Sequence, residues 1–130
     1  MTNQPLSGQR VLIVEDEMMI AMMLEDMLSQ LGCTVAAMAA NPASALAIIE
    51  SQPIDAAVLD VNLDGQTSYG VAAALEERGI PFLFSTGYGA LALDERYRRR
   101  RLLQKPFRQE DLGKALSAIL AERAAGPQGI

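Results

Sequence analysis

Hydrophobic residues along the chain follow two alternating patterns: short continuous runs and longer stretches with helical spacing. The continuous runs are typical of strands buried on both faces of a parallel sheet. Four are clear and the last is weaker: 11–14, 34–39, 56–61, 81–84 and 102–107. Strands separated by single helices predict right-handed βαβ units. We therefore expect an α/β fold with a doubly wound parallel sheet.

Helical spacing of the apolar residues predicts four helices, over residues 18–32, 41–52, 68–79 and 108–124. Gly32 is a common helix stop, and Asn41 followed by Pro42 is a typical helix start. Five of the seven methionines fall in the first helix, four of them close together at positions 18, 19, 22 and 23. An adaptable binding surface and a core-filling helix face both fit this pattern, and we expect the core.

Length and composition indicate one domain: 130 residues, about half of them apolar. We expect it to cover residues 9–123, between flexible ends at 1–8 and 124–130. A net charge of −5 argues against direct nucleic acid binding. No apolar run is long enough to span a bilayer and the start lacks a signal-peptide core, so we expect a cytoplasmic protein without membrane insertion.

The residue types present limit the possible chemistry. Cys33 is the only cysteine, which excludes an internal disulfide, and its apolar neighbours predict a buried, unreactive thiol. The chain has no histidine, which removes histidine nucleophiles, histidine bases and the usual zinc ligands. Carboxylates, hydroxyls and lysines remain as candidates.

Polar residues follow the predicted strands directly. The first such residues are Glu15 and Asp16, then Asp60, then Ser85 and Thr86, and finally Lys105. A single acidic residue after a strand is usually a helix cap. Carboxyl ends of parallel strands, however, meet at one edge of the sheet, where ligands bind. The convergence therefore predicts a site.

Clustered carboxylates repel one another unless a cation lies among them. Oxygen ligands without histidine or cysteine select a hard ion, and Mg²⁺ suits a few carboxylates combined with phosphate oxygens. A carboxylate beside Mg²⁺ can attack phosphorus and form an aspartyl phosphate. Lys105 would add a second positive charge, and the Thr86 hydroxyl would donate to a phosphoryl oxygen.

Together, these residues resemble the receiver domain of two-component response regulators, over about residues 9 to 122. The resemblance implies a flavodoxin-like sheet of five strands in the order 2-1-3-4-5. It implies that Asp60 is the phosphoacceptor and that Thr86 and Lys105 are the switch hydroxyl and the family lysine. It also implies that Mg²⁺ is held by Glu15, Asp16, Asp60 and the backbone carbonyl of Asn62.

The stretch PFLFSTGYG is similar to the FATGUY subgroup of single-domain receivers, with Ser85 in place of the signature alanine. Ordinary receivers carry a switching aromatic residue three positions before the lysine, where this chain has Leu102. We expect Tyr88 to take that part. The short interval between Thr86 and Lys105 predicts a shortened or irregular fourth helix.

The segment RYRRRR, residues 96–101, is the one dense basic stretch. A charged face that protects an edge strand and a docking surface for an acidic partner are about equally consistent with it. On the second interpretation, the partner surface comprises Tyr88, Arg98, Arg99, Arg100 and Arg101.

The leading functional hypothesis is a stand-alone receiver that accepts a phosphoryl group on Asp60 from a histidine kinase or phosphotransfer protein. It would signal through a downstream protein partner or act as a phosphate sink, as a switch rather than an enzyme. One alternative is a Mg²⁺-dependent phosphohydrolase with an aspartyl nucleophile, although Asn62 stands where a general-acid aspartate would favour it. Another is a degenerate receiver that only binds partners, against which Asp60, Thr86 and Lys105 argue.

Overall fold

The computed structural model describes residues 6–87, 93–97 and 100–124. Its main sheet has five parallel strands in the order β2-β1-β3-β6-β7. Their bounds are Arg10–Val14 (β1), Thr34–Ala39 (β2), Ala56–Asp60 (β3), Phe82–Thr86 (β6) and Leu102–Gln104 (β7). Counted within this sheet, the order is the predicted 2-1-3-4-5. The flavodoxin-like fold is therefore confirmed.

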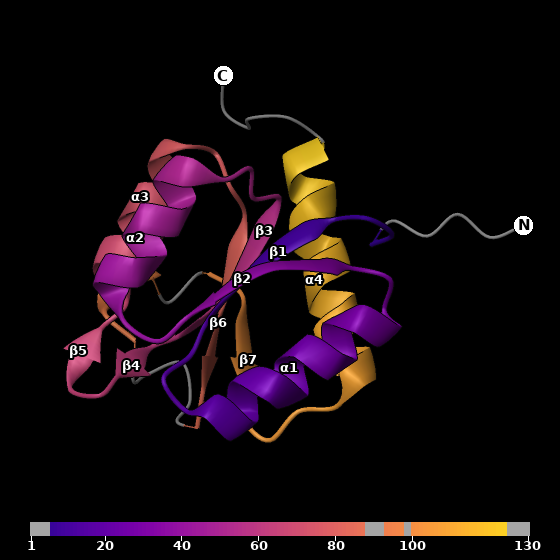
Figure 1. Ribbon diagram of the computed structural model, residues 1–130, viewed down its shortest axis with the longest axis horizontal. Helices are drawn as coiled ribbons and strands as arrows, with labels where there is room; N and C mark the ends of the chain where they lie inside the picture. Colours follow the sequence, from indigo (N-terminus) through magenta and orange to yellow (C-terminus); the bar gives the residue numbers. More distant parts are fainter. Residues whose placement is uncertain (1–5, 88–92, 98–99, 125–130) are drawn as a thin grey trace, which may run out of the picture.

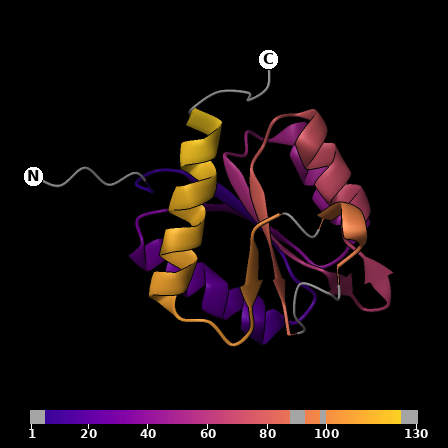
Figure 2. The same ribbon diagram turned by 180° about the vertical axis from the view of Figure 1, so that it is seen from behind.

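Helices cover both faces of the sheet (Figures 1 and 2). One face carries α1 (Met18–Gln30) and α4 (Gln109–Ala124), and the other carries α2 (Pro42–Ser51) and α3 (Tyr69–Glu77). Each face has its own core of buried apolar side chains, with Leu12, Leu59 and Phe84 under α2 and α3, and Ile13, Val58 and Leu83 under α1 and α4. The four predicted helices thus all form.

Helix boundaries follow the predicted signals. The Asn41 side chain accepts a hydrogen bond from the backbone N–H of Ser44 at 2.8 Å, which caps α2, and Pro42 is its first residue. Gly32 follows the end of α1 with a φ of +92°, a conformation that glycine adopts without steric cost. These two residues set the geometry on either side of β2.

A two-stranded hairpin directly after β3 was not predicted. It consists of β4 (Asn62–Leu63) and β5 (Gln66–Thr67), which pair antiparallel. Asp64 and Gly65, at the turn, have positive φ angles of 51° and 88°. Two residues with positive φ form the tight turn that an Asp-Gly pair favours in hairpins. The signal was therefore present in the sequence.

The expectation that the methionines at 18, 19, 22 and 23 fill the core is wrong, although Met27 of the same helix does pack against the core. Met18, Met19, Met22 and Met23 are 44 to 84% exposed. Ala21, Leu24 and Leu28 form the buried face of α1 instead. Helical geometry explains the outcome, since an apolar stripe on the other side of the helix already faces the sheet. We call the four exposed side chains the methionine surface.

Between β6 and β7, the described residues include a 3₁₀ helix, Glu95–Tyr97. Tyr97 is buried, stacked on Tyr69 with ring centroids 5.0 Å apart, and lies edge-on to Phe84 at 5.4 Å. This short helix agrees with the predicted shortened element. The aromatic contacts fix it to the start of α3 and to β6.

Two further expectations concern burial. Cys33 is buried, and burial raises the pKa of its thiol, as expected for an unreactive cysteine. Within the described part of the chain, no helix combines the length and apolar character needed to cross a bilayer.

Candidate functional site

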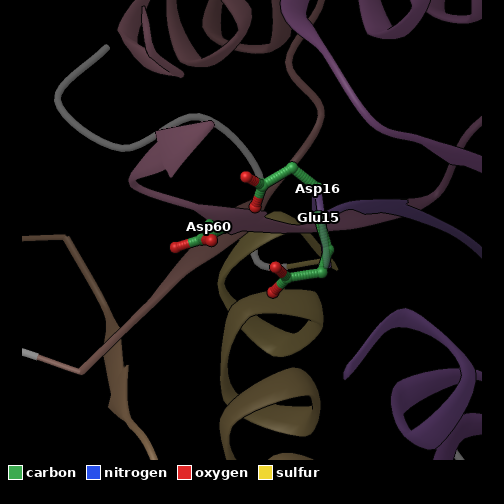
Figure 3. A group of neighbouring side chains, drawn as sticks. All are labelled: Glu15, Asp16 and Asp60. Atoms are coloured by element: carbon green, nitrogen blue, oxygen red, sulfur yellow. The ribbon is translucent and has the colours of Figure 1, made fainter. Parts of the chain in front are cut away.

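Three carboxylates meet at the carboxyl edge of the central strands. Glu15 and Asp16 directly follow β1, and Asp60 ends the neighbouring strand β3. One oxygen from each lies within 4.8 Å of the others, and Figure 3 shows the three side chains around one small volume. The strand ends place them there because β1 and β3 run parallel and in register.

Glu15 is the most buried member of this cluster, with 3% of its surface exposed. Burial raises its pKa to about 7, against the opposing effect of hydrogen bonds from the backbone N–H of Glu17 and from Lys105. Those bonds measure 3.1 Å to Oε2 and 3.0 Å to Oε1. The carboxyl group therefore titrates near neutral pH in the absence of a cation.

Asp60 is half-buried and close to the same ammonium. Its Oδ2 lies 3.6 Å from Lys105 Nζ. Burial raises the pKa of Asp60, while Lys105 and a hydrogen bond from the backbone N–H of Asn62 lower it. Burial disfavours the charged form of Lys105, but the two carboxylates outweigh it and raise the pKa of the ammonium. The lysine is thus charged whenever the carboxylates are.

This donor set fits a small divalent cation. Three carboxylates face one ammonium, so the ionised cluster carries excess negative charge in a partly buried place. All ligand atoms are oxygens, the type that Mg²⁺ binds. Glu15, Asp16 and Asp60 are the residues that would hold it.

The hydroxyl residues Ser85 and Thr86 lie on the next strand. β6 pairs with β3 so that Ser85 is opposite Asp60, and Thr86, the last residue of β6, is buried. The backbone carbonyl of Thr86 accepts a hydrogen bond of 2.8 Å from the N–H of Lys105. This bond ties the end of β6 to the segment that carries the lysine.

Comparison with known proteins assigns the family. The model of the response regulator receiver domain matches residues 11–117. The chain belongs to the response regulator receiver family. Among curated relatives, the transcriptional regulatory protein TcrA of Mycobacterium tuberculosis is 34% identical over 88% of this chain and 47% of its own length. This receiver thus spans about half the length of that relative.

Solved structures agree. SdrG from Sphingomonas melonis Fr1 is 50% identical, with a TM-score of 0.79 over 87% of this receiver and 97% of that chain. The response regulator PhyR from Brucella abortus is 28% identical, with a TM-score of 0.81 over 92% of this receiver and 51% of that chain. A second curated relative, compared by sequence, is the sensor protein TorS of Escherichia coli, which is 29% identical over 96% of this receiver and 14% of its own length. The receiver resemblance inferred from the motifs is therefore confirmed.

The structure brings most of the predicted site residues together. Glu15, Asp16, Asp60 and Lys105 share one cluster, and Thr86 ends the adjacent strand. The backbone of Asn62 adjoins Asp60 through its N–H. The role of its carbonyl toward a metal stays a prediction.

The predicted partner surface is only partly described. Tyr88, Arg98 and Arg99 lie outside the described residues. Arg100 forms an ion pair with Glu76 of α3 and lies over the ring of Phe82, and Arg101 pairs with Glu122 of α4 at 3.4 Å. These two arginines thus contact acidic residues of their own chain. Docking of an acidic partner at the segment stays a prediction.

Sequence reasoning missed the aromatic residues that anchor this segment. The Tyr69 hydroxyl accepts a hydrogen bond from the backbone N–H of Asp94 at 2.7 Å, and Tyr97 is buried beside it. Tyr97 stands inside the basic run 96–101, for which the sequence predicts a charged face or a docking surface rather than a buried contact. An aromatic residue among arginines was the available signal.

Proposed function

We propose that this receiver accepts a phosphoryl group on Asp60 from a phosphohistidine of a kinase or phosphotransfer protein. One observation carries the proposal. Asp60 lies in the carboxylate cluster with Lys105 Nζ 3.6 Å from its Oδ2. This is the arrangement of nucleophile and positive charge that phosphoryl transfer to a carboxylate needs.

In the proposed reaction, a carboxylate oxygen of Asp60 forms a bond to phosphorus while the phosphorus–nitrogen bond to the donor imidazole breaks. The imidazole leaves with the electron pair of that bond. Lys105 neutralises charge on the phosphoryl oxygens, and the Thr86 hydroxyl donates a hydrogen bond to one of them. Bound Mg²⁺ would supply further charge neutralisation and orient the phosphoryl group.

The methionine surface supports a protein as the donor. It lies on α1, the helix that follows Glu15 and Asp16. A pocket of about 370 Å³ at its edge is lined by Ile20, Met23, Lys105, Pro106 and Phe107. A donor whose imidazole reaches Asp60 would cover the methionine surface and this pocket. Flexible methionine side chains adapt to such contacts.

If the methionine surface contacts the protein donor, a substitution in it should slow transfer from that donor but not from a small-molecule donor. Met19→Glu slows transfer from the protein donor but not from acetyl phosphate, while Met38→Glu, on β2, changes neither. Equal slowing of both donors by Met19→Glu would contradict the docking role.

The hydrolase alternative gains no support from the structure. The Asn62 side chain accepts a hydrogen bond of 3.1 Å from the backbone N–H of Gly65, within the β4–β5 turn. It therefore serves the hairpin, and an amide cannot act as a general acid. We propose that the phosphorylated receiver signals through a protein partner or drains phosphate from a pathway.

The phosphoacceptor is tested by incubation with acetyl phosphate and Mg²⁺, followed by intact mass measurement. We expect one added phosphoryl group, which is lost in Asp60→Asn and without Mg²⁺. Asp55→Asn, at the residue just before β3, is the matched control and keeps the modification. Wild-type modification of Asp60→Asn would overturn the assignment.

The metal site is tested separately by thermal unfolding. Mg²⁺ that binds only the folded state stabilises it by about 2.7 kcal/mol at 100 times its dissociation constant. Asp16→Asn should remove this response. A wild-type melting temperature that is constant across millimolar Mg²⁺ would contradict the metal site.

A further inference from the structure

Ser85 carries a buried hydroxyl with no visible role. The residue is 1% exposed, and its Oγ has no hydrogen-bond partner among the residues that the structure describes. Within the same residues, only Ser68 Oγ shares this condition. An unsatisfied buried hydroxyl destabilises the folded state, because the group has lost its hydrogen bonds to water. A buried hydroxyl without a partner requires an explanation. One explanation is a hydrogen bond that forms only when the domain carries out its function.

The sheet places this hydroxyl on the reactive side. Ser85 is opposite Asp60 on one neighbouring strand and opposite Leu103 on the other. Residues opposite each other on parallel strands point to the same face. Lys105, two residues after Leu103, continues this alternation, because its N–H still bonds to β6 at Thr86. Ser85, Asp60 and Lys105 therefore share one face.

The lysine has to cross the strand that carries Ser85. β6 lies between β3 and β7, and neighbouring strands are about 4.8 Å apart. Lys105, just after β7, nevertheless reaches Asp60 at the end of β3 and Glu15 beyond β1. From the strand order, its side chain has to reach across the end of β6, the strand that carries Ser85. Because Ser85 pairs in register with Asp60, its side chain lies on the face of β6 that the ammonium has to cross to reach Asp60.

We infer that Ser85 is a positioning residue for phosphoryl transfer, whose hydroxyl accepts a hydrogen bond from the Lys105 ammonium and holds it over Asp60. The inference rests on the proposed function. An ammonium has three N–H donors; it donates to Glu15 Oε1 at 3.0 Å, and Asp60 Oδ2 lies 3.6 Å away, which leaves a third donor for Ser85. A bound cation would compete with the ammonium for Glu15, and the ammonium would then interact mainly with Asp60. Ser85 then supplies the acceptor that keeps it there.

A packing role makes a different prediction. If position 85 merely requires a small residue beneath the lysine side chain, alanine serves as well as serine. Ser85→Ala also removes the unsatisfied hydroxyl, so we expect its melting temperature to equal or exceed that of the wild type. Loss of rate without loss of stability therefore separates positioning from packing.

The experiment measures the initial rate of phosphorylation by acetyl phosphate with saturating Mg²⁺ in four proteins: wild type, Ser85→Ala, Ser85→Thr and Ser68→Ala. We expect Ser85→Ala to be about tenfold slower, as for one lost hydrogen bond to a charged group, or about 1.4 kcal/mol. Ser85→Thr keeps the hydroxyl and should restore the rate. Ser68→Ala removes the other unpaired hydroxyl and should leave it unchanged.

Three results would overturn the inference: Ser85→Ala as fast as wild type, Ser85→Thr as slow as Ser85→Ala, or Ser68→Ala equally slowed. Failure of the proposed function has its own signature. In that case the wild type takes up no phosphoryl group that depends on Asp60, and both proposals fall together.

Discussion

Two groups of charged side chains in this receiver differ in burial and in balance. At the carboxyl edge of the sheet, Lys105 faces Glu15 and Asp60, and the lysine side chain is 20% exposed. Near the start of β7, Arg100 and Arg101 each pair with one glutamate, and both arginines are about half exposed. In the first group, three clustered carboxylates share one ammonium, so negative charge is in excess. In the second group, each arginine neutralises one glutamate.

The difference separates a binding site from a structural contact. A buried surplus of carboxylates is unfavourable without a cation, so this charge distribution favours the binding of a cation. Exposed one-to-one pairs are screened by water and contribute little. Charge density in the sequence does not distinguish them, since the arginine run is the denser of the two.

The largest effect is expected from removing the ammonium. Lys105→Met leaves Glu15 and Asp60 buried without a positive neighbour, and we expect a loss of about 3 kcal/mol in the free energy of unfolding at pH 8. Denaturant unfolding without Mg²⁺ measures it. Lys114→Met, on the exposed side of α4, is the matched control and should change little. Equal losses in both variants would remove the distinction between the two groups.

The next effect concerns pH. Burial raises the pKa of Glu15 from 4.5 to about 7, so the folded protein binds more protons than the unfolded chain between these values. Stability without metal should therefore fall as pH rises from about 4.5 to 7, by on the order of 2 kcal/mol.

Glu15→Gln should flatten much of this slope, with a remainder from Asp60, whose pKa is raised in the same direction. Glu95→Gln, in the 3₁₀ helix, should preserve it. Unfolding free energies at pH 5, 6, 7 and 8 decide the matter, and a wild-type stability that rises over this range would contradict the assignment.

The smallest effect is expected at the arginines. Arg100→Ala should lower the unfolding free energy by less than about 1 kcal/mol, and added salt should reduce the difference. Arg101→Ala should cost less still, because Arg101 lacks the ring contact that Arg100 makes with Phe82. A loss as large as that of Lys105→Met would show that the pairs are not merely surface contacts.

The fold and the carboxylate cluster could be predicted because both depend on local pattern. Apolar runs give the strands, and the first polar residue after each run falls at the same edge. Asp16, Asp60 and Lys105 were found in this way. The β4–β5 hairpin was overlooked although the Asp-Gly pair at 64 and 65 indicates it.

Features that depend on contacts between distant parts of the sequence could not be predicted from local patterns. The first helix carries two apolar stripes, and nothing local states that Ala21, Leu24 and Leu28 face the sheet while the methionines face outward. Nor does the sequence show that Tyr97 turns inward against Tyr69, 28 residues earlier. Both depend on which elements become neighbours.

The methionine surface has a consequence for partner choice. Unbranched methionine side chains adopt many conformations at little energetic cost. The methionine surface can therefore make a large contact area with a partner without close shape complementarity. Such a surface discriminates poorly between related donors, and insulation of one signalling route from another then depends on repulsive contacts elsewhere. Replacement of the flexible side chains at positions 18, 19, 22 and 23 by branched ones would narrow the range of accepted donors, and competition between two donors for the same receiver would reveal it.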